Sequence, residues 1–294
     1  MRATVAGWCL SLAFGAAICM AQEAPVAVTQ PAAALSQPWP TSVYCSGFYT
    51  SQRVSDELRL VSGEQSEYKI TFAWRDIVYL SKGASQGIKP GDRFSVVREK
   101  SDLLRVPFFK WQDKLTNAMG THYVDLGQLE VIKALPNIAI AKVTMSCDLM
   151  QRGDIIRPFV ERPVGPYKDS SEFDKFAPAS GKPVAMVVRA RDTQQMIGKL
   201  DTIYVNLGTS QGVKVGDYFR IFRYQGTRSA IPVEKDYQDR LYGYGSNPKH
   251  YGWNDLPREV LGEGIVLNAS QNSATVLVTL TRAEVYAGDY VELE

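Results

Sequence analysis

The sequence predicts an all-β protein built from two tandem copies of a small, five- to six-stranded barrel-like module, with a signal peptide and proline-rich linkers. Three observations predict this class. Short β-branched and aromatic runs alternate with glycine-rich turns, one segment recurs later in the chain, and no long stretch after the first segment has helical periodicity. The hydrophobic content of 45% and charged content of 22% are typical of a globular protein.

The repeat consists of two collinear blocks. Residues 76–98 align with residues 201–223 without a gap, and 11 of 23 positions are identical. Unrelated segments of average composition share about one or two positions over this length. A second block, 126–154, aligns without a gap with 261–289. Because both blocks occur in the same order, the chain contains a duplicated domain.

The glycines of the first block predict tight, kinked passages between strands, since glycine adopts positive φ at low cost. An aspartate that follows a glycine can cap backbone N–H groups in an Asx-turn. A brief helical turn is expected around 114–118 or 236–241. A structural turn role is predicted for Gly83, Gly87, Gly91, Asp92, Gly208, Gly212, Gly216, Asp217, Gly153, Asp154, Gly288 and Asp289.

Composition divides the chain into five parts. They are a signal peptide at 1–21, a disordered tether at 22–42, a first β module with an N-terminal extension at 43–156, a Pro/Gly linker at 157–183 and a second β module at 184–294. The linker should be extended and packed over the surface, since prolines, glycines and scattered charges alternate along it.

The first segment has the features of an export signal. Arg2 provides a positive start, residues 5–18 form an apolar run, and Cys19-Met20-Ala21 offers small residues at the −3 and −1 positions of a cleavage site. The run is too short to span a membrane, so we expect no transmembrane span after cleavage. A lipoprotein alternative would acylate Cys19, but Ile18 stands where a small residue is normally needed. The expected location is periplasmic or secreted.

Two cysteines, Cys45 and Cys147, remain after cleavage. In an oxidising compartment, two cysteines without zinc partners predict one disulfide. It would close a loop of roughly 100 residues, worth up to about 4–5 kcal/mol in the chain-entropy model. The alternative is two separate buried thiols. A catalytic pair is disfavoured because neither cysteine lies in a C-x-x-C motif.

Charge and residue content argue against several functional classes. The formal net charge of +2 leaves no basic field for nucleic acid, and two histidines offer little material for a metal site. No cofactor or metal is expected. The repeated aspartates lie in Gly-Asp turns, so backbone capping explains them more simply than acid–base catalysis. The sequence has no H-E-x-x-H helix or Walker loop.

The inserts between the repeated blocks are the candidate binding surfaces. Aromatic side chains with polar tips are typical of interface hot spots and of sugar-stacking platforms. Alternatively, the inserts fold back and cap an open end of the barrel. The shorter insert of copy one contains Phe108, Phe109, Trp111, His122 and Tyr123. In copy two, the candidate binding surface comprises Tyr237, Tyr242, Tyr244, His250, Tyr251 and Trp253.

The order of motifs carries a family resemblance. A strand, the pattern G-x-x-x-G-[IV]-K-x-G-D, a strand, an insert, L-G, a hairpin, G-D and a strand follow one another at about 75–156 and 200–294. This order resembles the C-terminal β module of the flagellar assembly protein T family, which also occurs in uncharacterised exported bacterial envelope proteins. Tyr44-Cys45-Ser46-Gly47-Phe48 with Ser146-Cys147-Asp148 is similar to one such group. The resemblance implies a periplasmic assembly, such as the ring around the flagellar motor.

These observations favour a non-catalytic exported envelope protein that acts as a scaffold or as a protein-partner-binding module. Its partner would be an envelope protein or a cell-wall component. The first alternative is a carbohydrate- or peptidoglycan-binding module that uses the aromatic insert 224–260. The second is an enzyme, although no reaction type is implied by the residues.

Overall fold

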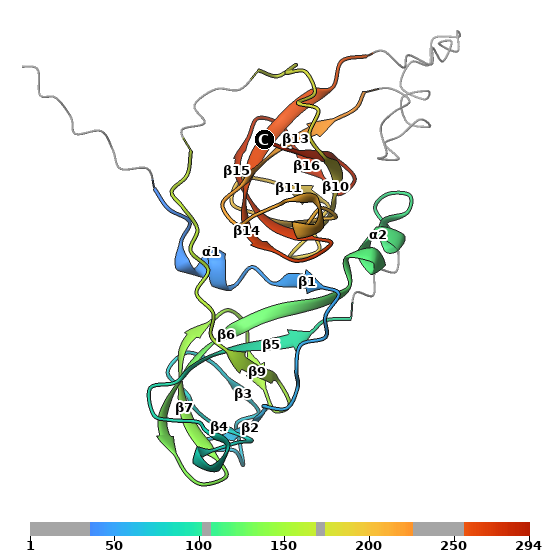
Figure 1. Ribbon diagram of the computed structural model, residues 1–294. Helices are drawn as coiled ribbons and strands as arrows, with labels where there is room; N and C mark the ends of the chain where they lie inside the picture. Colours follow the sequence, from blue (N-terminus) through green and yellow to red (C-terminus); the bar gives the residue numbers. More distant parts are fainter. Residues whose placement is uncertain (1–35, 102–106, 169–173, 226–255) are drawn as a thin grey trace, which may run out of the picture. The chain divides into compact units, whose positions relative to one another are not determined.

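The computed structural model describes residues 36–101, 107–168, 174–225 and 256–294 (Figure 1). Strands dominate these ranges, which confirms the predicted all-β class with barrel-like modules. Residues 35–294 form one unit by their contacts. Within the described ranges, no helix has both the length and the apolar character needed to cross a bilayer.

The first module is built around one antiparallel sheet. Its strands are β1 (Phe48–Thr50), β2 (Leu60–Gly63), β4 (Ile77–Leu80), β5 (Arg93–Glu99), β6 (Thr121–Ala134), β7 (Ala139–Ser146) and β9 (Ile155–Pro158). The order is β2-β4-β7-β6-β5-β9, and β1 pairs with β6. An antiparallel bridge joins Arg59 to Ile155, and Leu60 N–H donates to the Asp154 carbonyl at 3.0 Å. These contacts bring β2 to β9, so the sheet nearly closes on itself.

The second module is a closed barrel (Figure 1). Its strands are β10 (Val184–Ala190), β12 (Thr202–Val205), β13 (Tyr218–Arg223), β14 (Glu259–Ala269), β15 (Ala274–Thr281) and β17 (Tyr290–Leu293). Their order, β10-β12-β15-β14-β13-β17, repeats that of the first module strand for strand. The duplication read from the two sequence blocks is therefore also a duplication of topology.

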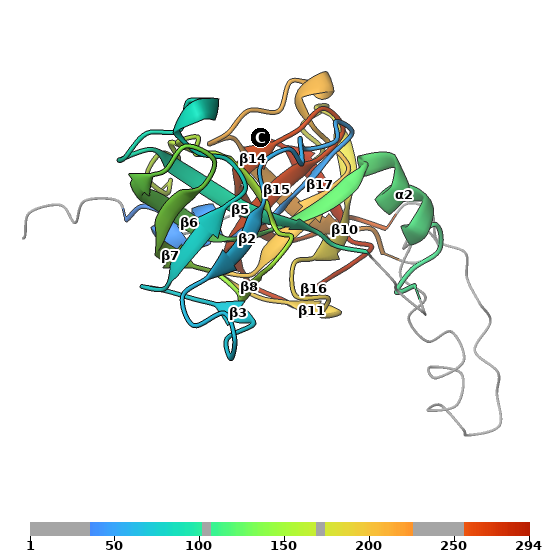
Figure 2. The ribbon, with the colours of Figure 1, turned by 90° about the horizontal axis from the view of Figure 1, so that it is seen from below.

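Each module carries the same small additions to its barrel. A ribbon of β3 (Thr71–Phe72) and β8 (Met150–Gln151) in the first module corresponds to β11 (Met196–Ile197) and β16 (Val285–Tyr286) in the second (Figure 2). The 3-10 turns η1 (Ala84–Gln86) and η2 (Thr209–Gln211) follow β4 and β12.

The two cores are also equivalent. Val78, Phe94 and Leu126 are buried in the first module, and Ile203, Phe219 and Leu261 occupy the matching positions of the second. The strand β4 alternates between buried and half-buried positions, as expected when one face of a strand points into a barrel. Burial of these apolar side chains provides the main driving force for folding of each module.

Two short helices lie outside the barrels. The helix α2 (Gln112–Met119) confirms the helical turn expected around 114–118, while the alternative position at 236–241 lies outside the described residues. The side chain of Gln112, the first residue of this helix, accepts a hydrogen bond from the N–H of Phe108 in the preceding segment at 2.7 Å. Gly120, with φ of 102°, ends it.

Two expected boundaries are wrong. The disordered tether was expected to include 36–42, but α1 (Pro40–Tyr44) begins inside this range. Pro40 supplies a helical φ at the first turn, and Val43 is buried against Leu267 and other residues of β14 and β15. The linker was expected to begin at residue 157, yet Arg157 and Pro158 still pair with β5 because β9 extends that far. The segment 1–21, which we expect to be a signal peptide, lies outside the described residues.

Candidate functional site

The turn glycines have two different roles. Gly87, Gly91 and Gly153 have φ of 88°, 89° and 92°, and their counterparts Gly212, Gly216 and Gly288 have 87°, 90° and 104°. In contrast, Gly83 and Gly208 are extended. A Cβ atom at Gly83 would overlap with the carbonyl oxygen of Leu135, and one at Gly208 would overlap with that of Ser270. The first group therefore supplies left-handed backbone, and the second permits close approach of two chain segments.

The repeated aspartates cap backbone groups. In all of them a carboxylate oxygen accepts a hydrogen bond from the N–H three residues earlier, with donor–acceptor distances from 2.6 to 2.8 Å. This use of the carboxylate leaves no opposed pair of free carboxylates in these turns. The residues are Asp76, Asp92 and Asp154 in the first module and Asp201, Asp217 and Asp289 in the second.

Two of these aspartates also form buried ion pairs. Arg98 donates from Nε and Nη2 to Asp154 at 2.7 and 2.9 Å, and Arg223 does the same to Asp289 at 2.7 Å for both bonds. The carboxylates are 3% and 0% exposed. Such bidentate pairs position a strand end against the neighbouring wall of the barrel.

A further group of charges lies on the second barrel. Arg258 contacts both carboxylate oxygens of Glu292 at 2.6 and 2.7 Å, and Arg220 adds a contact to Glu292 at 3.3 Å. Lys168 pairs with Glu294 beside them. Burial acts to raise the pKa of Glu292, but the hydrogen bonds from Arg258 and from the Ser180 N–H, together with the charges of Arg258 and Arg220, outweigh it and hold that pKa below its usual range. The central pair, Arg258 and Glu292, is buried, and charges that neutralise each other in this way need no ligand.

The aromatic candidates fall into two groups. Tyr237, Tyr242, Tyr244, His250, Tyr251 and Trp253 all lie outside the described residues. In copy one, Phe109, His122 and Tyr123 are buried, with 1%, 2% and 0% exposure, and only Trp111 is strongly exposed, at 61%. The first three therefore pack inside the fold and offer no binding surface.

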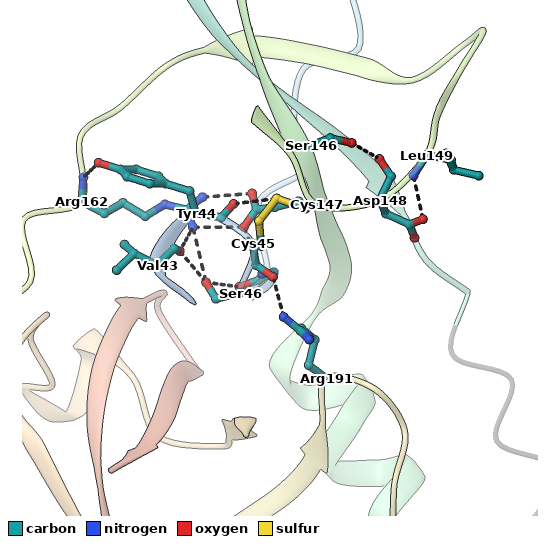
Figure 3. Close-up of a disulfide and its surroundings, with 12 residues drawn as sticks. Val43, Tyr44, Cys45, Ser46, Ser146, Cys147, Asp148, Leu149, Arg162 and Arg191 are labelled. Carbon is teal, nitrogen blue, oxygen red and sulfur yellow. Dashed lines mark hydrogen bonds and ion pairs between the residues drawn. A yellow bond between two sulfur atoms is a disulfide. The ribbon is translucent and has the colours of Figure 1, made fainter. Parts of the chain in front are cut away.

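The predicted disulfide joins Cys45 to Cys147, with a Cα–Cα distance of 5.3 Å (Figure 3). It attaches residues 43–50, hereafter the junction segment, to the end of β7. The Gly47 N–H donates to Asp125 at 3.0 Å, and Arg162 binds both oxygens of that carboxylate at 3.1 Å. The junction segment is thus fixed to the first module by a covalent bond and by a buried carboxylate.

The other side of the junction segment contacts the second module. Its carbonyl oxygens at Ser46, Gly47 and Tyr49 accept hydrogen bonds from the hydroxyls of three residues of the second module, at 2.8, 3.0 and 3.1 Å respectively. Those three donors are Tyr204, Thr275 and Ser273. The strand β1 pairs with β6 of the first module along one edge. Hydroxyl groups of the second module provide the hydrogen bonds that carbonyl oxygens of the junction segment would otherwise lack.

Aromatic rings complete this junction. Tyr49 stacks on His122 with a centroid distance of 4.5 Å and meets Tyr204 edge-on at 5.0 Å. Nε2 of His122 lies 3.2 Å from the Tyr204 hydroxyl. On the same side, the side-chain amide of Gln112 donates to the Val188 carbonyl of β10 at 2.8 Å. The sequence predicted the disulfide in this region and offered His122 only as part of an insert with a candidate binding surface. It did not reveal the hydroxyl donors, because no local pattern identifies a hydroxyl that binds a distant carbonyl.

Within the ranges that the structure describes, no three His, Cys, Asp or Glu side chains gather into a possible metal site. In comparisons with known proteins, no protein-family model matches the chain and no curated protein matches it.

Proposed function

We propose that this chain is a non-catalytic protein of the bacterial envelope and that it acts as a scaffold. The junction segment is the observation that supports this role. It is covalently attached to the first module through Cys45 and hydrogen-bonded to the second through the carbonyl oxygens of Cys45, Ser46, Gly47 and Tyr49. Two β modules joined in this manner can present partner-binding surfaces at a fixed spacing.

The use of the repeated side chains supports a non-catalytic role. Each repeated aspartate is occupied by a backbone N–H, and two of them are also held by an arginine. General acid–base catalysis needs a carboxylate or histidine that faces a substrate. The repeated residues are better explained by the needs of the fold.

An exported location rests on the sequence and on the disulfide. Disulfides persist in oxidising compartments, and the first 21 residues have the pattern of a cleavable signal. The likeness to the flagellar assembly protein T module supports an envelope assembly as the setting. The intact mass of the exported protein tests this step. Cleavage after Ala21 is expected, and a lipid on Cys19 or an uncleaved start would overturn it.

The scaffold role is tested by uncoupling the modules. Combined Tyr204→Phe, Ser273→Ala and Thr275→Val substitutions remove the three hydroxyl donors to the junction segment. The control variant, Ser85→Ala with Ser210→Ala, removes two hydroxyls from the exposed turns η1 and η2. Urea unfolding of the uncoupled variant should show two separate module transitions, whereas wild type and control should show one.

Crosslinking in the intact envelope then reports the function. Wild type and control should crosslink to the same envelope proteins, and the uncoupled variant should lose at least one of those crosslinks while both modules remain folded. Identical crosslinks from the uncoupled variant would show that the fixed spacing is not used. If wild type crosslinks to no protein, the scaffold proposal fails.

A further inference from the structure

Two surface grooves lie at equivalent positions of the two modules. The groove of the first module, with a volume of about 410 Å³, is lined by Trp74, Arg75, Ile132, Lys142 and Thr144, among others. The second groove, about 630 Å³, is lined by Lys199, Leu200 and Thr279 of the second module and by Trp39 of the segment before α1. The offsets of the sequence repeat map positions 74, 75 and 144 onto 199, 200 and 279.

Both grooves contain a residue in an unusual backbone conformation. Arg75 has φ of 72°, and Leu200, its counterpart, has φ of 71°. Each N–H donates to a carbonyl of the neighbouring strand, that of Val143 at 3.0 Å or that of Val278 at 2.8 Å. Glycine would adopt this conformation without strain, yet both copies place a long side chain there. Strained positions of this kind concentrate at sites that bind ligands.

Each groove also has an exposed aromatic surface. Trp74 is 57% exposed and Trp39 is 74% exposed. Aliphatic side chains accompany them, Ile132 at 51% and Leu200 at 60% exposure. An indole ring combines a flat apolar face with a polar edge, which suits the C–H face and the hydroxyls of a sugar ring. The hydroxyls of Thr144 and Thr279 line the grooves at matching positions. Each donates its proton to a backbone carbonyl, that of Gln128 or Glu263, and keeps a lone pair that can accept a hydrogen bond from such a ligand.

The grooves carry uncompensated positive charge. Arg75 lies over the Trp74 ring at 4.0 Å, and neither Arg75 nor Lys142 forms an ion pair with any residue in the described part of the chain. Glu130 lies opposite Lys142 and offsets one of the two charges. In the second groove, Lys199 has no ion-pair partner among the described residues. Both sites therefore favour an anionic ligand.

We propose that the two grooves bind an acidic polysaccharide of the cell wall, with one stretch of the strand in each groove. The combination of tryptophan, hydroxyl and cation fits sugars that carry carboxylates. Repetition of the site fits a ligand that is itself a repeating polymer, because two linked sites bind such a strand more tightly than either alone. This proposal concerns sites distinct from the aromatic insert 224–260, and it does not depend on the scaffold role.

The test measures cosedimentation of the full-length mature protein with purified sacculi and with glycan strands released from their peptides. Trp39→Ala and Trp74→Ala should each weaken binding to both materials by about tenfold, and the double variant should not bind. Trp111→Ala is the matched control, since Trp111 is 61% exposed and lines neither groove. Thermal melting of all variants should remain close to wild type, because each replaced ring is mostly exposed.

The charge is tested separately. Arg75→Gln and Lys199→Gln should weaken binding to released strands, whose sugar carboxylates are free once the peptides have been removed, and should leave binding of uncharged chitin oligosaccharides unchanged. Several results would overturn the proposal: no binding of wild type to either material, binding as strong as wild type by the Trp39 and Trp74 variants, or binding to sacculi but not to released strands. The last result would identify wall peptides as the ligand. None of these results bears on the protein crosslinks that test the scaffold role.

Discussion

Arg223 binds the buried carboxylate of Asp289 through Nε and Nη2, with both hydrogen bonds 2.7 Å long. The same Nη2 donates to the Glu284 carbonyl at 3.0 Å, so the guanidinium joins β13 to the turn before β17. Arg98 and Asp154 reproduce this arrangement in the first module, including a bond to the Leu149 carbonyl at 3.1 Å. The ion pair thus fastens one strand end in each copy of the fold.

Removing the carboxylate of Asp289 should destabilise the second module severely. Asp289→Ala leaves the Arg223 guanidinium half-buried without its partner and also frees the Tyr286 N–H. We expect a loss of about 3–5 kcal/mol in the free energy of unfolding, measured by urea denaturation. Asp217→Ala is the control, because that carboxylate caps only the Lys214 N–H, and it should cost about 1 kcal/mol. Equal losses for the two variants would contradict a structural role for the pair.

The two kinds of turn glycine should respond differently to alanine. Gly91→Ala places a side chain at φ of 89° in open space and should cost about 1–2 kcal/mol through backbone strain. Gly83→Ala should cost more, about 3 kcal/mol, because the new Cβ overlaps with the Leu135 carbonyl. Gly165→Ala, in open space without positive φ, is the control and should leave the unfolding curve unchanged. A smaller loss for Gly83→Ala than for Gly91→Ala would refute the distinction.

Loss of the disulfide should weaken the attachment of the junction segment. The bond joins residues 102 positions apart, and Cys45→Ser with Cys147→Ser should lower the free energy of unfolding by about 2–4 kcal/mol. Reduced wild type should show the same loss. Reducing agent should not change the free energy of unfolding of the double variant. If it does, the loss seen in reduced wild type is not caused by cleavage of the Cys45–Cys147 bond alone.

Acid should destabilise the second barrel through Glu292. Its folded pKa lies below the unfolded value, so its contribution to stability is complete above the unfolded pKa of about 4.3 and is lost as pH falls through the folded value. Glu292→Gln removes the titrating group and should flatten this part of the stability profile, while lowering stability at pH 7 because Arg258 and Arg220 lose their partner. Chemical denaturation from pH 7 to pH 3 measures both effects. If the free energy of unfolding of the variant falls with decreasing pH as steeply as that of wild type, other carboxylates cause the acid destabilisation.

Local patterns were sufficient for much of this molecule. The repeated blocks predicted two copies of one β module, since strand periodicity and turn glycines are properties of neighbouring residues. The capping role of Asp92 and Asp217 was also accessible, because each carboxylate binds an N–H only three residues away. The disulfide was predicted from the two cysteines that lie outside the expected export signal, and the structure confirms it.

Contacts between distant residues were decided only by the tertiary structure. Ser273 donates to the Tyr49 carbonyl across 224 residues, and Thr275 reaches Gly47 across 228. The residues around these hydroxyls do not indicate that they donate to the junction segment, because the carbonyl partners come close only when both barrels and that segment are folded. The same reason explains the error at 36–42, whose proline-rich composition is typical of a tether. This stretch is ordered because α1 finds an apolar surface on the second barrel, which no local pattern could reveal.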